Sequence, residues 1–308
     1  MPRSRLAIDA SGGDYAPDEI IAGAILGARR HPIQLTLVGQ SEQIEACLRR
    51  HAVDGLAIDI VDAPETIGLD EDPALAVRKK KDASIVVCCE LVHEDRAEAV
   101  ISMGQAGAGI AAALFTLGRL PGVDRPGLIV PYLGFRDTFL IDAGADPEVR
   151  PQNLLQFAIM GSLYVERVIG ITNPLVGLLP NESAPNAGDA SNQQVYALLQ
   201  TSGLNFIGNV EGSALSHGLA NVIVTDGFTG GSALKPGEGL VAEWLKQAAE
   251  TAPDNENAAA APVLGINGLI FIGHSRSKAP AVAGAIGNAI CAVEGGLLNA
   301  IRDRLKAA

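Results

Sequence analysis

Short apolar runs rich in β-branched residues alternate with amphipathic segments from one end of the chain to the other. The runs have the length of strands, and the apolar positions between them recur with a helical period. Such alternation requires crossover connections, which place helices on both faces of a mainly parallel sheet. The sequence therefore predicts an α/β fold of this architecture.

The pattern also predicts the bounds of the elements. The predicted strands span residues 5–9, 34–38, 57–61, 99–102, 127–131, 138–142, 175–179, 221–225 and 267–272. The predicted helices span residues 17–30, 41–51, 82–94, a stretch beginning near 107, 151–167, 190–201, 232–250 and 279–305. With 308 residues, the chain can form a single domain over 1–308, or two lobes that share a sheet. The acidic, alanine-rich segment 250–262 indicates an exposed linker or loop.

Charge and cysteine content disfavour several classes of protein. A formal net charge of −12 disfavours broad nucleic-acid binding. The 4 cysteines form no CxxC pair and the 5 histidines show no ligand spacing, so we expect no metal site. No apolar stretch reaches the roughly 18 residues of a membrane span, and no signal region follows the basic start. We therefore expect a cytoplasmic protein without a transmembrane segment.

The first candidate loop for catalysis or ligand binding is DASGGDYAP, residues 9–17, directly after the first predicted strand. Gly12 and Gly13 let backbone amides approach a ligand, and Asp9 and Asp14 supply carboxylates. A tight turn with a capping aspartate explains the same residues equally well. The loop lacks the GxGxxG spacing of a dinucleotide site.

A second loop, SMGQAGAG at 102–109, joins a predicted strand to an apolar helix. Glycines at a helix start expose amides that suit a phosphate group. Ser102, Gly104 and Gly107 are therefore candidates for phosphate binding. Gln105 is a candidate hydrogen-bond donor, although a plain helix start is the alternative.

A third loop, TDGFTGGSALK at 225–235, repeats the arrangement of strand, glycine corner and helix. Asp226 lies where the strand is predicted to end, and Lys235 is near the helix start. Gly227 and Thr229 are candidates for phosphate binding. The recurrence of one arrangement in one chain favours a catalytic or phosphate-binding role over a simple turn.

A basic cluster, formed by Arg78, Lys79, Lys80 and Lys81, stands out in this acidic chain. Runs of charge usually form a solvated face. In a protein of net negative charge, the cluster also suits the docking of a phosphopantetheine arm or an acidic carrier protein.

Together these motifs resemble the bacterial phosphate acyltransferase family over residues 5–294. The strings that carry the resemblance are IDASGGDYAP (8–17), AVRKKKDAS (76–84), LIDAGAD (140–146), LLQFAIMGSLY (154–164), FIGNVEG (206–212), VTDGFTG (224–230) and PVLGINGL (262–269). The resemblance implies a homodimer with a fold similar to those of isopropylmalate dehydrogenase and phosphotransacetylase. The implied reaction of phospholipid synthesis moves a fatty acyl group from acyl carrier protein, or acyl-CoA, to inorganic phosphate. It requires no metal or redox cofactor.

The loops and the resemblance together assign roles to individual residues. Catalytic roles fall to Gln105, Asp226 and Lys235. Phosphate or substrate binding falls to Asp9, Gly12, Gly13, Asp14, Ser102, Gly104, Gly107, Gly227, Thr229 and His274. Carrier-protein docking falls to Arg78, Lys79, Lys80 and Lys81.

Several positions depart from the family pattern, and all lie where chemistry is expected. Asp146 replaces an asparagine, and its added negative charge is expected to oppose phosphate binding. The other departures are Gln105–Ala106 in place of Asn–Thr, Ala187–Gly188 in place of Lys–Gly, Gly231 in place of Asn, and Gly273–His274–Ser275 in place of Ala–His–Gly.

These departures leave other hypotheses open. The chain could be a non-catalytic relative that binds acyl carrier protein or an acyl ligand. A dehydrogenase that shares only the fold is a third hypothesis, opposed by the missing dinucleotide fingerprint and metal-carboxylate cluster. The segment after Leu240 is shorter and more acidic than the basic, apolar insertion of the family, which predicts no membrane association.

Overall fold

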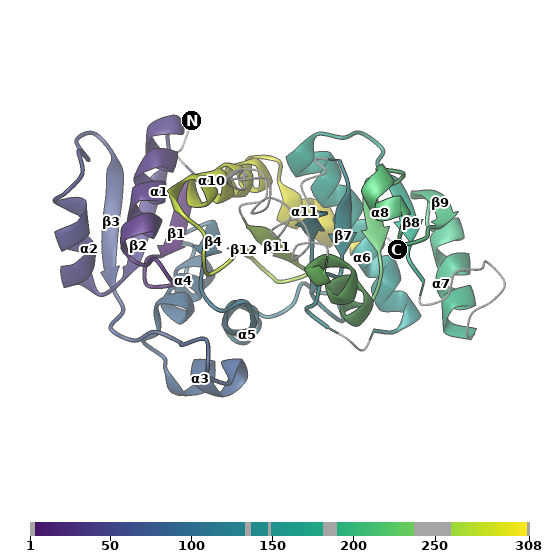
Figure 1. Cartoon of the computed structure of the whole chain (residues 1–308), viewed down its shortest axis with the longest axis horizontal. Coiled ribbons are helices and arrows are strands. Elements are labelled where there is room, and N and C mark those ends of the chain that lie inside the picture. The colour runs from purple at the N-terminus through teal and green to yellow at the C-terminus, as the bar shows by residue number, and fades with distance from the viewer. Residues whose placement is uncertain (1–3, 133–136, 147–148, 181–189, 237–259, 307–308) are drawn as a thin grey trace. The chain divides into compact units, whose positions relative to one another are not determined.

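A computed structural model describes residues 4–132, 137–146, 149–180, 190–236 and 260–306 (Figure 1). The chain divides into two compact units. Unit 1 comprises Met1–Gly118 and Asp254–Glu294, and unit 2 comprises Arg119–Pro253 and Gly295–Ala308. Each unit contains strands and helices of its own, so each is described separately.

The sheet of unit 1 is parallel apart from one pair of strands. Its order is β3 (Ala57–Asp62), β2 (Gln34–Gly39), β1 (Arg5–Asp9), β4 (Ala99–Ser102), β12 (Leu269–Ile272) and β11 (Ala261–Leu264). Only β11 runs antiparallel to its neighbour β12. The apolar central strands β1, β4 and β12 are almost completely buried, as expected for a sheet covered on both faces.

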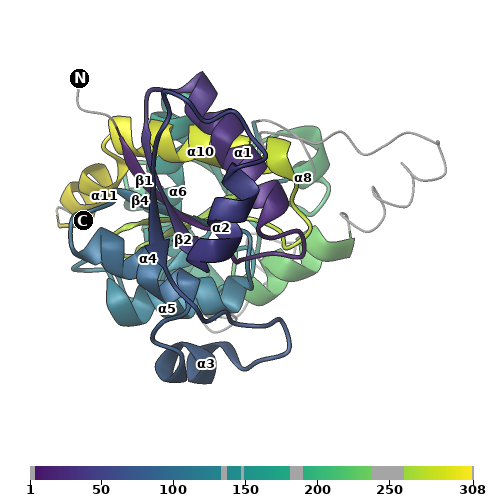
Figure 2. The same cartoon turned by 90° about the vertical axis from the view of Figure 1, so that its left-hand side faces the viewer.

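Helices cover both faces of this sheet (Figures 1 and 2). Helix α1 (Asp18–Arg30) packs on α10 (Ala279–Glu294), and α4 (Ser84–His93) packs on α5 (Ala106–Thr116). The two pairs lie on opposite faces. The shorter helices of this unit are α2 (Ser41–Leu48) and α3 (Pro73–Lys79).

Unit 2 has a second, smaller sheet. Its order is β6 (Val130–Pro131), β7 (Phe139–Ile141), β10 (Val222–Val224), β8 (Leu175–Leu178) and β9 (Asn205–Asn209), parallel apart from β6. The remaining elements are β5 (Gly127–Leu128), α6 (Pro151–Tyr164) with the π-helical turn η1 (Val165–Ile169), α7 (Ala190–Thr201), α8 (Ala214–His217), a helix over 227–236 and α11 (Leu297–Lys306).

The predicted fold class is confirmed, and so are most of the predicted elements. The sequence pattern missed α3, α8, β9 and β11. The predicted strand 127–131 is divided into β5 and β6, and the predicted helix 279–305 is interrupted near Gly296, whose φ is +63°. A left-handed residue cannot continue a helix.

Two expectations concern the region after residue 226. The helix expected at 232–250 begins earlier, at residue 227, and its part beyond 236 lies outside the described residues. Residues 250–259 of the expected linker also lie outside them. Its last two residues belong instead to strand β11, because Ala261 and Pro262 pair with Ile272 and Phe271 of β12.

Within the described residues, no single helix has both the length and the apolar character needed to cross a membrane. One bent pair of consecutive helices, Ala279–Glu294 and Leu297–Lys306, meets the length and composition criteria only when taken together.

Candidate functional site

The carboxyl ends of β1 and β4 meet in the middle of the unit 1 sheet. The two strands are parallel neighbours, with Asp9 opposite Ser102. From β1 the chain turns towards β2 and β3, whereas β12 lies on the other side of β4. The loops after β1 and β4 therefore diverge, and such a switch in strand order leaves a crevice that commonly binds ligands.

A cavity of about 200 Å³ occupies this position. Its walls bring together the first two predicted loops and a segment between β3 and α3. The lining residues are Asp9, Ser11, Gly12, Gly13, Asp14, Thr66, Ile67, Gly68, Leu69, Ser84, Ile85, Ser102, Gly104, Gln105 and Ala108.

Asp9 is the most buried polar side chain of this cavity, together with its two serine neighbours. It is 3% exposed. The Ser102 hydroxyl donates to Asp9 Oδ2 at 2.6 Å and accepts from the Gly104 amide at 3.0 Å. Asp9 Oδ1 has no hydrogen-bond partner among the described residues. Burial raises the pKa of Asp9, and hydrogen bonds from Ser102 and Ser84 partly oppose this rise.

The absence of a side chain at residue 12 lets the two glycine loops touch. A Cβ atom there would lie 2.4 Å from Asp9 Oδ2 and 3.0 Å from the Gly104 amide nitrogen. The neighbouring Asp14 amide donates to the Ser275 carbonyl at 2.7 Å. The loops after β1 and β4, and the loop after β12, are therefore joined at one end of the sheet.

Gln105 holds one wall of the cavity in place. Its Nε2 donates to the carbonyls of Leu69 at 3.0 Å and Glu71 at 3.1 Å. Its Oε1 is buried and has no partner among the described residues. The predicted donor is thus already engaged with the 66–71 segment, and a catalytic role for Gln105 stays a prediction.

Helix α5 starts at this cavity. Its first turn closes with the Gly109 amide donating to the Gln105 carbonyl at 3.0 Å. The amides of a first helical turn have no acceptor within the helix, and they carry a partial positive charge. Gly104 and Ala108 line the cavity, whereas Gly107 is exposed and faces the Pro73 ring.

Sequence reasoning missed two parts of this site. Ser84, the first residue of α4, is buried and hydrogen bonded to Asp9. The segment Thr66–Leu69 forms a wall, and its position depends on a bridge between Glu65 and Ala83. Neither contact has a local sequence signal, because both join segments that are separate along the chain.

His274 follows β12 and is exposed. It is not among the residues that line the cavity. Its predicted role in substrate binding is not supported by this geometry and remains a prediction.

The third predicted loop belongs to unit 2, where Asp226 caps the helix over 227–236. Its two carboxylate oxygens accept from Thr229, one from the amide at 2.8 Å and the other from the hydroxyl at 2.7 Å. The Gly227 amide donates to the Asp146 carbonyl at 3.0 Å. Lys235 is exposed. Helix capping by Asp226 is sufficient to explain the residues of this loop. Their catalytic and phosphate-binding roles stay predictions.

Asp142 organises the turn that this helix packs against. It is buried, and it accepts from the amides of Leu128, Gly144, Ala145 and Asp146 at 2.7–3.2 Å. Burial raises the pKa of Asp142, and these four amides oppose the rise. A Cβ at residue 230 would lie 1.9 Å from the Asp142 carbonyl oxygen, so the helix can approach this turn only with glycine there.

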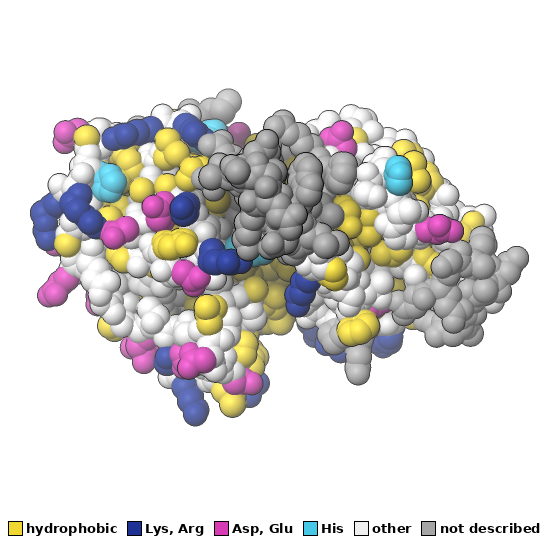
Figure 3. Space-filling view, viewed as in Figure 1, with side chains coloured by type: hydrophobic (Ala, Val, Ile, Leu, Met, Phe, Trp, Pro, Cys, Tyr) yellow, Lys and Arg dark blue, Asp and Glu magenta, His cyan; other side chains and the backbone are white. Residues whose placement is uncertain are grey.

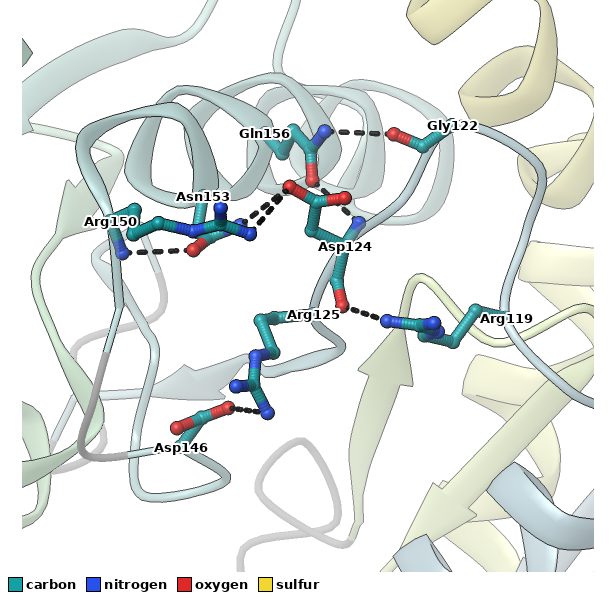
Figure 4. A network of polar contacts seen from close by, with 8 residues as sticks. All are labelled: Arg119, Gly122, Asp124, Arg125, Asp146, Arg150, Asn153 and Gln156. Carbon is teal, nitrogen blue, oxygen red and sulfur yellow. Dashed lines mark hydrogen bonds and ion pairs between the residues drawn. The ribbon is translucent and has the colours of Figure 1, made fainter.

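The charge of Asp146 is compensated within unit 2, which corrects the expectation that it stands as an added negative charge. Its carboxylate forms an ion pair with Arg125 at 3.0 Å (Figure 4). The neighbouring residue Asp124 accepts from Arg150 at 3.3 Å and from Asn153 at 3.5 Å, and its carbonyl accepts from Arg119. This network holds the 119–125 segment against the start of α6.

The basic cluster is divided between two environments. Lys80 donates to Glu71 at 2.7 Å and to the Thr66 carbonyl at 2.8 Å, so it supports the cavity wall. The Arg78 guanidinium lies over the Phe115 ring, 4.8 Å from its centroid. Arg78, Lys79 and Lys81 are exposed.

The exposed cations lie beside exposed apolar side chains. Leu75 of α3 is 53% exposed and Phe115 of α5 is 47% exposed. At the lower edge of Figure 3, where Figure 1 places α3, basic, acidic and hydrophobic side chains lie together. We call the exposed side chains of Leu75, Arg78, Lys79, Lys81 and Phe115 the α3 surface.

Known proteins similar to this chain indicate one family. Residues 4–255 match the family described as fatty acid synthesis protein. The chain is 43% identical over 328 residues to the phosphate acyltransferase of Pelotomaculum thermopropionicum, covering 98% of this chain and 95% of the relative. It is also 43% identical to the phosphate acyltransferase of Syntrophomonas wolfei, covering 90% and 91%.

Solved structures confirm the expected likeness of fold. The phosphotransacetylase of Streptococcus pyogenes matches with a TM-score of 0.66 at 17% identity, over 95% of this chain and 94% of that one. The branched-chain phosphotransacylase of Enterococcus faecalis matches with a TM-score of 0.54 at 13% identity, over 94% and 99%. At these identities the likeness concerns the fold alone.

Proposed function

Because this chain belongs to the phosphate acyltransferase family and is an acyltransferase of fatty acid and phospholipid synthesis, we propose that its acyl donor is the thioester of acyl carrier protein or acyl-CoA. The acceptor is inorganic phosphate, and the product is a fatty acyl phosphate. The observation that supports this best is the cavity at the carboxyl ends of β1 and β4, where two glycine loops and the start of α5 meet.

In this proposal phosphate binds at the start of α5. Backbone amides of a first helical turn can hold an anion without a metal ion. They also orient it, which matters because a bound nucleophile reacts as if at high concentration. The same kind of donor stabilises the oxyanion that forms when phosphate attacks the thioester carbonyl.

Thiol release from palmitoyl carrier protein, measured with and without phosphate on the purified chain, tests this function. Release that depends on phosphate is the expected outcome. If the carrier protein binds and no thiol is released, the chain is a binding relative that has lost its chemistry. The departures at Gly231 and Ala187, of which Ala187 lies outside the described residues, motivate that second candidate.

The carrier protein is proposed to dock on the α3 surface, where exposed cations surround exposed Leu75 and Phe115. The double variant Arg78→Glu with Lys81→Glu leaves Lys80 and the cavity wall intact. We expect it to raise KM for the acyl carrier protein about tenfold at low salt, through lost charge complementarity. KM for uncharged acyl-pantetheine should not change.

Arg49→Glu with Lys306→Glu is the matched control, since it changes the net charge equally at exposed positions that do not belong to the α3 surface. An equal rise in KM for both donors would contradict docking on the α3 surface. The protein is further proposed to be a cytoplasmic homodimer without membrane association. Light scattering on the purified chain and flotation with anionic liposomes test these two points.

A further inference from the structure

Acyl transfer from a thioester to phosphate has a chemical difficulty at the leaving group. Attack by a phosphate oxygen forms a tetrahedral intermediate that can expel either phosphate or thiolate. A free thiol has a pKa of about 8.5, whereas a phosphate group titrates near pH 6. Phosphate is therefore the better leaving group, and the intermediate returns to the thioester unless sulfur receives a proton.

The unit 1 cavity has the lining expected for the neutral thioester end of an acyl donor. None of its lining residues is lysine, arginine or histidine. Apolar side chains of Ile67, Leu69 and Ile85 face it together with serine hydroxyls and backbone groups. Amides and apolar methylenes of a pantetheine arm match such walls.

Asp9 is the group of this cavity with a free position for a proton. Its Oδ2 accepts from Ser102, whose oxygen in turn accepts from the Gly104 amide. A proton held by the carboxyl therefore resides on Oδ1, the oxygen without a partner among the described residues. The unpartnered atom belongs to a side chain that is 97% buried and lines the cavity, since Asp9 is 3% exposed.

The surroundings of Asp9 favour its neutral form. Burial raises the pKa of Asp9 above its ordinary value, and it outweighs the opposing hydrogen bonds from Ser102, Ser84 and the amides of Ser11 and Gly12. The thiols of Cys88 and Cys89 on α4 are also buried, which raises their pKa values and keeps them uncharged. Asp14, the other carboxyl group of the lining, is exposed to solvent. No cation among the lining residues stabilises an Asp9 carboxylate.

We propose that Asp9 donates the proton that the sulfur atom takes up as the carbon–sulfur bond breaks, and that the unit 1 cavity holds the thioester end of the acyl donor. This inference rests on the function proposed above. An oxygen of HPO₄²⁻ attacks the carbonyl carbon, and the electron pair of the carbon–sulfur bond goes to sulfur. Sulfur takes the proton of Asp9 Oδ1. The P–OH proton then returns to Asp9, leaving a neutral thiol and an acyl phosphate dianion.

The test compares two thioesters of one fatty acid, palmitoyl-pantetheine and palmitoyl-4-nitrothiophenol, with phosphate as acceptor. The nitrothiophenolate leaves without a proton. In Asp9→Asn, we expect kcat to fall by about 10²–10⁴-fold with the pantetheine ester, the range for a lost general acid. With the nitrothiophenyl ester it should fall less than about tenfold, because no proton is needed there. Asp54→Asn, at an exposed position of unit 1, is the matched control and should behave as the wild type.

Each outcome distinguishes the two proposals. Equal losses on both esters in a folded Asp9→Asn protein would overturn the role of Asp9 and leave the proposed function standing. No phosphate-dependent cleavage of either ester by the wild type would overturn the proposed function itself.

The wild type alone provides a test that does not require the variant to fold. With proton donation, the two esters should react at rates within about tenfold of each other, since the proton from Asp9 offsets the poorer leaving ability of the pantetheine sulfur. A nitrothiophenyl ester that reacts more than about 100-fold faster would show that no proton is donated, and would overturn the inference.

Discussion

Each unit places a buried aspartate in the sequence Ile-Asp-Ala directly at the end of a strand, but the two aspartates are used differently. Asp142 of unit 2 accepts from four backbone amides, three of them in its own turn and one, that of Leu128, in strand β5. Asp9 of unit 1 receives the Ser102 hydroxyl on one oxygen, while the other has no partner among the described residues and the side chain lines a cavity. The amides of Ser11 and Gly12 also lie close enough to lower the pKa of Asp9. Hydrogen bonds to both carboxylate oxygens therefore distinguish the structural aspartate from the candidate reactive one.

The largest expected effect comes from removing the Asp142 carboxylate. Asp142→Ala leaves four part-buried amides without their acceptor, and hydrogen bonds to a charged group are each stronger than ordinary ones. We expect a loss of about 3–5 kcal/mol in the free energy of unfolding, measured by urea titration at pH 7. Asp9→Asn in unit 1 should cost less than about 1 kcal/mol, because it replaces a poorly satisfied carboxyl group by an amide of similar size. Equal losses in the two variants would show that the two aspartates contribute alike to stability.

A second, smaller effect should follow from adding a side chain where helix 227–236 contacts the Asp142 backbone. Gly230→Ala places a methyl group 1.9 Å from the Asp142 carbonyl oxygen, so helix 227–236 must move away from the turn. We expect a loss of about 2–3 kcal/mol in the free energy of unfolding. At the adjacent Gly231, the Ala143 carbonyl oxygen at 3.8 Å is the only atom of the described residues that a Cβ meets, so Gly231→Ala serves as the control. A control that loses as much stability as Gly230→Ala would exclude this explanation.

The smallest expected effect is the pH dependence of stability that Asp9 adds. Its pKa is raised in the folded protein, so above pH ~4, the ordinary pKa of aspartate, the folded state binds more protons than the unfolded state. Wild-type stability should therefore fall as pH rises from about 4 towards the folded pKa, by about 1.4 kcal/mol for each unit of the shift. Asp9→Asn removes this part of the pH dependence. Urea titrations of both proteins between pH 4.5 and 8 should show curves that diverge with rising pH. Parallel curves would mean that Asp9 ionises as easily in the folded protein as in the unfolded chain.

Much of the fold followed from local pattern. The predicted strands 5–9 and 99–102 coincide with β1 and β4, because fully buried parallel strands are short, continuous and apolar. Helix α3 escaped prediction although Asp72 caps it and Pro73 opens it. It has only 7 residues, and an apolar residue, Leu75, lies on its exposed face, so the sequence shows no clear amphipathic pattern there.

The candidate site was predicted in part. The glycines and aspartates of the first two loops are typical of a strand–loop–helix corner, and these loops do meet in one cavity. Ser84 and the Thr66–Leu69 wall were not foreseen, since a bridge between Glu65 and Ala83 brings them there. The third loop had the same local signal as the second, yet its carboxylate caps its own helix.

The sequence by itself determined the α/β class, most of the strands and helices of both units and the family, because periodicity and motif order are local properties of the chain. Only the tertiary structure decided which aspartate is a candidate to react. That depends on whether both oxygens of the carboxylate are hydrogen bonded, and on whether the space beside it is filled. Asp142 has amides on both oxygens and a helix packed against its turn, whereas Asp9 has one oxygen without a partner among the described residues and a cavity of about 200 Å³ beside it.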